Sequence, residues 1–289
     1  MSWRAASALL VLTVVTGCKP ARTVEPANAT ASQRLLSAAP NVTEICCALG
    51  LEDRLVGRTR YCTYPPDIVA VPSIGALNDV NPEALLRLAP DRVLVSGTSR
   101  AITDRLARLG LRYEAIPDTT LADLFDGIVQ IGALTHREEA ATGLVRELRA
   151  QLASIAARWA DVPSARVLIL TAPLVDPPAR LDAAGPGSFY DDLLRLAGHQ
   201  NALEAWTGAF PAVSLEFVLR ADPEVIIELS PEPGTRAGGD EDALRTWSKV
   251  GSLQAVAQKR VRVLVGEKYF VLGPRITETF EALCACIAK

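Results

Sequence analysis

The strongest constraint on the fold is an alternation of short apolar strands with amphipathic helices that runs twice along the chain. The alternation begins at Arg34 and begins again at Ala165. Strands separated by helices indicate βαβ units, which build mainly parallel sheets. Between the two runs, His136–Trp159 lacks proline and places apolar residues at three- and four-residue spacing, which predicts one amphipathic helix of about 24 residues. Such a helix spans about 36 Å, longer than one lobe requires. We therefore expect two α/β lobes joined by one long helix.

The individual elements follow from the same patterns. Asn41, with Glu44 three residues later, predicts a capping box, and Ser188 is expected to cap the helix that follows it. The predicted strands are 34–39, 55–59, 92–96 and 113–116 in the first run, and 166–170, 225–228 and 261–264 in the second. The predicted helices are 41–49, 83–88 and 103–109, and then 189–196, 217–220 and 278–287.

A short internal repeat relates the two runs. Asn81–Leu94 resembles Ser214–Ile227, and Glu83 and Glu216 correspond at a separation of 133 residues. Each copy has a capping residue, a glutamate in the first helical turn, a short helix and a buried strand. The glutamates have a simple explanation as partners of the helix dipole, worth about 0.3–1 kcal/mol each. Their pairing also favours a two-point acidic clamp for a partner that carries two arginine pockets.

The N-terminus has the pattern of an export signal. Residues 1–17 contain one positive charge and then thirteen uncharged residues, Ala5–Gly17, which are too few to span a bilayer. The segment Val15–Cys18 resembles the lipobox of bacterial lipoproteins, which implies that Cys18 is acylated; the alternative is an ordinary secretory signal with an incidental cysteine. Residues 18–33 lack apolar periodicity and indicate a flexible tether. We therefore expect a periplasmic or cell-envelope lipoprotein, attached to the membrane by its lipid alone.

After the tether, the sequence divides into three predicted parts. These are an N-terminal lobe at 34–135, the interlobe helix at 136–160 and a C-terminal lobe at 161–289. An exported location permits disulfides, but the spacings of the other five cysteines match no metal pattern. Most of them are expected to be small buried apolar residues, and a bridge from Cys62 to Cys46 or Cys47 stays open. The remaining two cysteines are Cys284 and Cys286.

Charge and composition narrow the function. A net charge of -3 and a pI of about 5.6 argue against a nucleic-acid partner, which requires a basic face. Two histidines nearly exclude a metal site built on three imidazoles. There is no nucleophile elbow, and Gly185–Ser188 lacks the ending of a phosphate-binding loop. We therefore expect no enzyme, although a lipid-anchored hydrolytic α/β enzyme and a structural or adhesive lipoprotein remain as alternatives.

From about Arg34 to the C-terminus, the chain resembles the substrate-binding proteins of ABC importers for vitamin B12, haem and iron–siderophore chelates. The segments that carry the resemblance are 36–45, 55–66, 74–91, 184–194, 210–216 and 273–275. It implies the class III periplasmic-binding-protein fold, an α/β fold with two Rossmann-like lobes of mainly parallel sheet on one long helix. It also implies a monomer without a cofactor of its own, which delivers ligand to a permease dimer and its ATPase. The glutamates matching Glu83 and Glu216 dock onto permease arginines in that family.

Ligand in such a fold lies in the crevice outside the carboxyl ends of the strands. Aromatic residues are only 5% of the chain, yet five lie in the loops expected there and suit a flat macrocycle. The predicted ligand-binding residues are Tyr61, Leu77, Ser96, Trp206, Phe210, Glu267, Tyr269 and Phe270. The loops show no arginine cluster for a polyanionic catecholate, which favours cobalamin or another corrinoid. Leu77 and Ser96 stand where B12 receptors often carry tryptophans, so a haem or ferric-siderophore ligand is the alternative, with Tyr61 as a possible haem-iron ligand.

Overall fold

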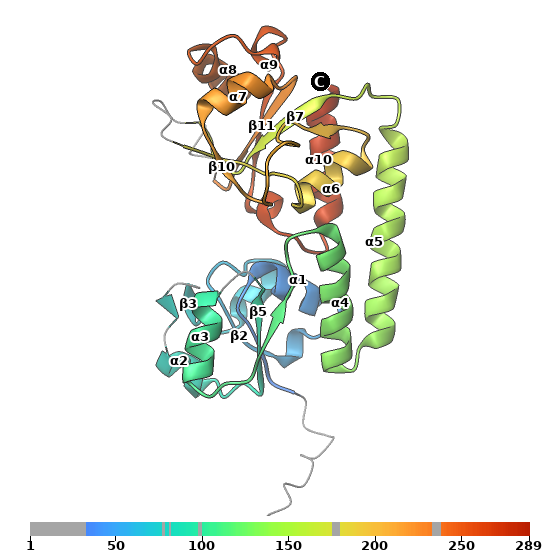
Figure 1. Ribbon diagram of the computed structural model, residues 1–289. Coiled ribbons are helices and arrows are strands. Elements are labelled where there is room, and N and C mark those ends of the chain that lie inside the picture. The colour runs from blue at the N-terminus through green and yellow to red at the C-terminus, as the bar shows by residue number, and fades with distance from the viewer. Residues whose placement is uncertain (1–32, 77–78, 81, 98–99, 175–179, 233–237) are drawn as a thin grey trace, which may run out of the picture. The chain divides into compact units, whose positions relative to one another are not determined.

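The computed structural model describes residues 33–76, 79–80, 82–97, 100–174, 180–232 and 238–289 (Figure 1). These residues belong to one compact unit, Gln33–Lys289. The expected signal peptide, Cys18, almost all of the expected tether, and Leu77 lie outside the described residues. Within the described part of the chain, no helix has the length and apolar character needed to cross a membrane.

The first lobe is built on a four-stranded parallel sheet in the order β2-β1-β5-β6. Its two central strands are buried, as expected where helices cover both faces of a parallel sheet. The strands are β1 (Leu35–Ser37), β2 (Leu55–Arg58), β5 (Arg92–Ser96) and β6 (Tyr113–Ile116), and a small antiparallel pair joins β3 (Gly75–Ala76) to β4 (Asp79–Val80). The helices are α1 (Pro40–Ala48), α2 (Pro82–Arg87), α3 (Arg100–Arg108) and α4 (Leu121–Thr135), with 3-10 turns at Glu52–Arg54 and Pro66–Ala70.

The second lobe repeats this plan with the parallel sheet β12-β11-β7-β9. Its strands are β7 (Arg166–Leu170), β9 (Gln200–Asn201), β11 (Val225–Ser230) and β12 (Val261–Val265), and β8 (Leu181–Asp182) pairs antiparallel with β10 (Ala212–Val213). The helices are α6 (Phe189–Leu196), α7 (Leu215–Ala221), α8 (Gly239–Ser248), α9 (Gln254–Ala257) and α10 (Ile276–Ala288), with a 3-10 turn at Glu267–Phe270.

The two sheets share one strand order. Numbered along the chain within each lobe, both read 2-1-3-4. In each sheet the order therefore reverses between the first and third strands, which are β1 and β5 in one lobe and β7 and β11 in the other. Ligands of open α/β sheets bind at this point, outside the carboxyl ends of the strands. The expected α/β fold of two parallel-sheet lobes is confirmed.

Helix α5 (Glu138–Arg158) runs alongside both lobes and packs against α4 and α10 (Figure 1). Its 21 residues correspond to about 32 Å. The indole nitrogen of Trp159, just beyond its C-terminus, donates a hydrogen bond to the Glu281 carboxylate at 3.2 Å. Leu148, Leu152 and Ile155 of α5 belong to one hydrophobic cluster that includes buried residues of both lobes.

One local expectation was wrong, and the long helix forms as expected but starts two residues later. Helix α1 begins at Pro40 after Ala39, without a side-chain cap, so the capping box expected from Asn41 and Glu44 does not form. Proline at the first helical position has no N–H to cap, and this frees Glu44 for another partner. Helix α5 begins after His136, which ends α4 in the left-handed conformation with φ of 59°.

Helix α4 was not predicted, although the sequence carries its signal. Thr120 and Asp123 form the reciprocal capping box, with the Asp123 N–H donating to the Thr120 hydroxyl oxygen at 3.1 Å. The expected cap at Ser188 is confirmed, because its hydroxyl oxygen accepts from the Asp191 N–H. All five described cysteines are free thiols. Burial raises the pKa of Cys47 to about 12 and that of Cys286 to about 11.

Candidate functional site

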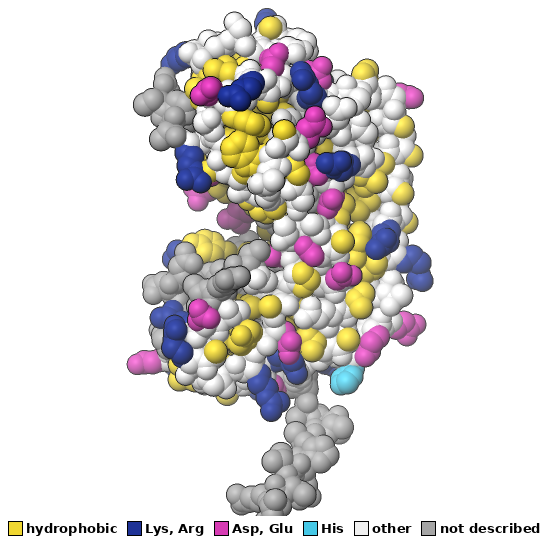
Figure 2. Space-filling view, in the orientation of Figure 1, with side chains coloured by type: hydrophobic (Ala, Val, Ile, Leu, Met, Phe, Trp, Pro, Cys, Tyr) yellow, Lys and Arg dark blue, Asp and Glu magenta, His cyan; other side chains and the backbone are white. Residues whose placement is uncertain are grey.

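A cavity of about 450 Å³ lies between the lobes, at the reversal point of the first sheet. The described residues that line it are Ala38, Ala39, Pro40, Asn41, Thr59, Tyr61, Ser96, Asp118, Phe189, Phe210, Phe270, Val271 and Leu272. Ala38–Asn41 directly follow β1, and Ser96 ends β5, so the first lobe contributes the ends of the strands that flank its reversal point. The volume of the cavity is in the usual range for small-molecule sites. Figure 2 shows the surface hollowed between the lobes.

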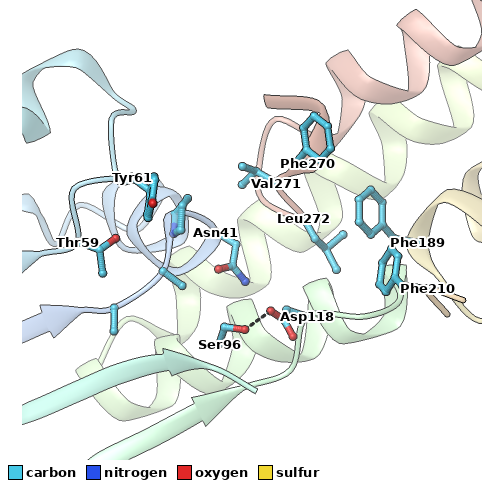
Figure 3. A pocket seen from close by; sticks show the side chains of 13 residues that line it. Asn41, Thr59, Tyr61, Ser96, Asp118, Phe189, Phe210, Phe270, Val271 and Leu272 are labelled. Atoms are coloured by element: carbon cyan, nitrogen blue, oxygen red, sulfur yellow. Dashed lines mark hydrogen bonds between the residues drawn. The ribbon is translucent and has the colours of Figure 1, made fainter. Parts of the chain in front are cut away.

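The first lobe supplies a polar wall, which we define as Asn41, Thr59, Ser96 and Asp118 (Figure 3). Strands β5 and β6 are neighbours, with Ser96 opposite Ile116, and this pairing brings Asp118 to Ser96. The Ser96 hydroxyl donates a hydrogen bond to the Asp118 carboxylate. This wall therefore presents an amide, two hydroxyls and a carboxylate to whatever occupies the cavity.

The second lobe supplies an apolar wall, which we define as Phe189, Phe210, Phe270, Val271 and Leu272 (Figure 3). Tyr190 supports it from behind. Its ring stacks on Phe189 with centroids 3.9 Å apart and meets Phe210 edge-on at 6.4 Å. The Tyr190 hydroxyl donates to the Tyr269 carbonyl oxygen at 2.6 Å, and burial raises the pKa of Tyr190. The aromatic faces are thus held by stacking and by a buried hydrogen bond.

An ion pair joins the two lobes at a second cavity of about 330 Å³, which shares Tyr61 and Phe270 with the first. Arg275, just before α10, donates from Nε to the Glu44 carboxylate of α1 at 3.1 Å. The Arg275 guanidinium carbon also lies 3.8 Å from the centroid of the Tyr64 ring. Burial raises the pKa of Glu44, and the guanidinium opposes that rise. Glu44 is therefore a desolvated carboxylate whose charge depends on Arg275.

The structure brings most of the predicted ligand-binding residues together. Tyr61, Ser96, Phe210 and Phe270 line the first cavity, and Glu267 lines the second. The Thr63 hydroxyl donates to the Glu267 carboxylate at 3.4 Å, which ties the two lobes at this edge.

Two predicted residues lie elsewhere. Trp206 packs edge-on against Phe217, with ring centroids 4.7 Å apart, over a hydrophobic cluster of the second lobe. Tyr269 packs against the central cluster, and Lys268 lies over its ring at 5.3 Å. Neither is among the described residues that line the cavities.

Sequence reasoning missed Asn41, Asp118 and Phe189, and it placed Thr59 in a loop of the cleft without naming it as a ligand-binding residue. A usable signal existed for Asn41 and Asp118, because each comes shortly after the carboxyl end of a strand. Asn41 was interpreted as a helix cap, and the segment after β6 was not counted among the loops of the cleft. Phe189 had no such signal, since its apolar side chain looks like any helix residue that faces a core.

The paired glutamates lie away from the cavities. Glu83 is exposed near the start of α2, and Glu216 is exposed near the start of α7. The Glu216 side chain is 83% exposed and pairs with Arg220 one turn later at 3.0 Å. In α7 the Ser214 hydroxyl oxygen accepts from the Phe217 N–H at 3.2 Å, so the expected cap forms there.

Comparison with known proteins identifies the family of the chain. The profile described as periplasmic binding protein matches residues 36–267, most of the chain. The chain belongs to the periplasmic binding protein family. This family consists of extracytoplasmic substrate-binding receptors of ABC importers, so a small-molecule ligand, a permease and an ATPase are its partners.

Named relatives cover nearly the whole chain. The vitamin B12-binding protein of Pectobacterium atrosepticum is 24% identical over 263 residues, covering 89% of each chain. An uncharacterized ABC transporter substrate-binding lipoprotein of Bacillus subtilis is 27% identical over 262 residues, covering 88% of this chain and 80% of the relative. The crystal structure of the periplasmic heme-binding protein of Vibrio cholerae matches with a TM-score of 0.75 and 22% identity, covering 90% of this chain and 100% of that one. The structural likeness supports the two-lobed fold.

Proposed function

We propose that this protein binds a metal chelate between its lobes, with cobalamin or another corrinoid preferred, and delivers it to an ABC importer. The observation that carries the proposal is the cavity itself, in which a polar wall faces an aromatic wall. A corrin has a broad apolar face and a rim of amides. The face suits the phenylalanines, and the amides suit the hydroxyls, amide and carboxylate opposite them.

A haem or ferric-siderophore ligand is the second candidate. It is favoured by the Tyr61 hydroxyl at the mouth of the cavity, where a phenolate would ligate iron; that hydroxyl oxygen accepts from the Arg60 guanidinium at 2.9 Å. Against haem, its propionates need cations. Arg275 is the one cationic side chain among the described residues of the first two cavities, and Glu44 already binds it.

Calorimetric titration with cyanocobalamin, haemin and a ferric hydroxamate tests the ligand. We expect saturable binding of cyanocobalamin at a ratio of one per chain. Tighter binding of haemin or of the hydroxamate would transfer the assignment to the second candidate. Absence of binding by all three would remove the proposal and restore the anchored-enzyme alternative.

We also propose that Glu83 and Glu216 dock the receptor onto the permease. Their exposure and their matching places on α2 and α7 support this role. Uptake by vesicles that contain the permease and the ATPase should collapse for the variant with both Glu83→Ala and Glu216→Ala, while ligand affinity stays within twofold of the parent. A matched control replaces Glu138 and Glu147, two exposed glutamates of α5, and should transport normally. Loss of ligand affinity with intact uptake would contradict the docking role.

Attachment through Cys18 is the last part of the proposal. It is supported by the lipobox-like sequence. Mass spectrometry of the protein extracted from membranes should find the mature chain beginning at an acylated Cys18. A mature N-terminus at another residue would favour an ordinary secretory signal.

A further inference from the structure

The charges that line the second cavity point to a more specific ligand. We infer that this cavity selects a chelate that carries positive charge, and that Glu232 and Glu267 are the residues that select it. The inference rests on the proposed function, because it concerns the ligand of the same site. It goes further in assigning a charge to the ligand and a role to a side pocket next to the main cavity.

The second cavity is lined by three carboxylates and one cation. The carboxylates are Glu44, Glu232 and Glu267, and the cation is Arg275. Because Glu44 and Arg275 bind each other, the charge that remains is that of Glu232 and Glu267. Neither has a cationic partner within ion-pair distance among the described residues, and both are exposed to the cavity and to solvent. A further carboxylate, Asp182, lines the adjoining cavity of about 320 Å³.

Other cations near these cavities are already engaged. Lys268, next to Glu267 in sequence, donates to Glu278 at 2.7 Å. Arg58, behind the polar wall, donates to the carbonyl oxygens of Ile68, Thr59 and Val69. Arg60 lies at the mouth, over the Tyr61 ring at 5.0 Å, and is exposed. Among the described residues, these positions leave the two glutamates facing the cavity as a net negative pair.

The pocket also has the second element of a cation site, an aromatic surface. Tyr61 and Tyr64 line it, and the Tyr64 ring already receives one guanidinium, that of Arg275. Aromatic faces and carboxylates together attract cations, and the attraction grows when water is displaced. Glu267 comes at the start of the 3-10 turn after β12, and Glu232 lies two residues after β11, so neighbouring strands of one sheet set both carboxylates at the same edge.

Matched chelates that differ by one charge test this inference. Aquacobalamin at pH 6 carries one positive charge more than cyanocobalamin and has the same corrin. Ferrioxamine B carries an ammonium that its N-acetyl derivative lacks. For whichever class binds, we expect the more positive member to bind roughly tenfold more tightly at low salt. The preference should shrink as ionic strength rises, since part of the pocket is open to solvent.

The variant with both Glu232→Gln and Glu267→Gln should reduce the ratio of the two affinities to about one. The control variant, with Glu204→Gln and Glu241→Gln, removes the same charge from exposed glutamates outside the cavities and should keep the parent ratio. Methylcobalamin, another neutral corrinoid, should bind like cyanocobalamin and so excludes an effect of the axial group.

The outcomes separate this inference from the proposed function. Equal affinities for the two members of a pair, or an unchanged ratio in the double variant, would overturn the charge selection and leave the receptor assignment intact. Binding of haemin alone, with its two propionates, would also overturn it. Failure of every chelate to bind would remove the proposed function itself.

Discussion

The two walls of the cavity come from sheets with the same strand order but have opposite chemistry. In the first lobe, polar groups at or after the strand ends line the cavity at Asn41, Ser96 and Asp118, beside the small apolar residues that directly follow β1. In the second lobe, the corresponding side is covered by Phe189, Phe210 and neighbouring apolar residues. The topology therefore fixes where the cavity lies, while the side chains that line it set which ligand chemistry it suits. A ligand that satisfies both walls must itself have one apolar face and one polar edge.

The ion pair between Glu44 and Arg275 joins the two lobes beside these walls, and its loss should have the largest effect. Arg275→Met leaves the Glu44 carboxylate, only 3% exposed, without its cation. We expect a loss of about 2–3 kcal/mol in the free energy of unfolding at pH 7.5, below the usual cost of a broken buried pair because the Arg275 side chain is 19% exposed. Urea denaturation monitored by circular dichroism measures this loss.

The pH dependence of that variant has a defined sign. Burial already raises the pKa of Glu44 above 4.5 in the folded protein, and loss of the guanidinium raises it further. Above that pKa, folding must bury an unpaired charge. Between that pKa and 4.5 the folded state holds a proton that the unfolded chain releases, so stability recovers as pH falls. Glu44→Gln should cost less than Arg275→Met at pH 7.5, because it leaves no buried carboxylate; the reverse order would contradict this account.

Truncation of the apolar wall should have the next largest effect, on affinity. Phe210→Ala is expected to weaken cyanocobalamin binding roughly tenfold to thirtyfold, through loss of stacking area in the cavity. The Phe210 side chain is 51% exposed, so the free energy of unfolding should change little. The control is Tyr113→Ala, an exposed aromatic at the amino end of β6, away from the cavity. Equal losses in the two variants would argue against a specific role for Phe210.

A change in the polar wall should have the smallest effect. Asn41→Ala removes one amide from the cavity and is expected to weaken cyanocobalamin binding about fivefold, the value of one typical hydrogen bond. Gln151→Ala, an exposed amide on α5, provides the control. Titration calorimetry on both variants compares the walls directly. If Asn41→Ala costs more affinity than Phe210→Ala, the polar wall dominates binding and the comparison is reversed.

Much of the fold could be predicted because its signals are local. Apolar runs mark β5, β7 and β11, and three- and four-residue spacing marks α5. Helix α4 was not predicted, although Thr120 and Asp123 have the spacing of a capping box at its start. The capping box at Asn41 failed because the neighbouring proline takes the first helical position, and this moves Glu44 from a local partner to Arg275, 231 residues away.

The site was less predictable because it depends on packing between lobes. Position after a strand placed Tyr61, Ser96 and Phe210 at the cleft, and all three line the first cavity, since strand ends meet at one edge of a sheet. The same argument could not separate Phe270, which lines the cavity, from the adjacent Tyr269, which packs on the core. A helical turn sends neighbouring side chains in different directions, and the sequence does not show which side the cavity is on.

One hydrophobic cluster continues from the first lobe through α4 and α5 into α10. This cluster bears on how long the proposed ligand would stay bound. Pulling the lobes apart would expose its apolar surface, at about 25 cal/mol per Å². Wide separation of the lobes is therefore costly, and we expect the proposed ligand to leave past Tyr61 and Phe210, which line the cavity and are 49% and 51% exposed. Rapid release is then expected to require an external partner that pulls the lobes apart.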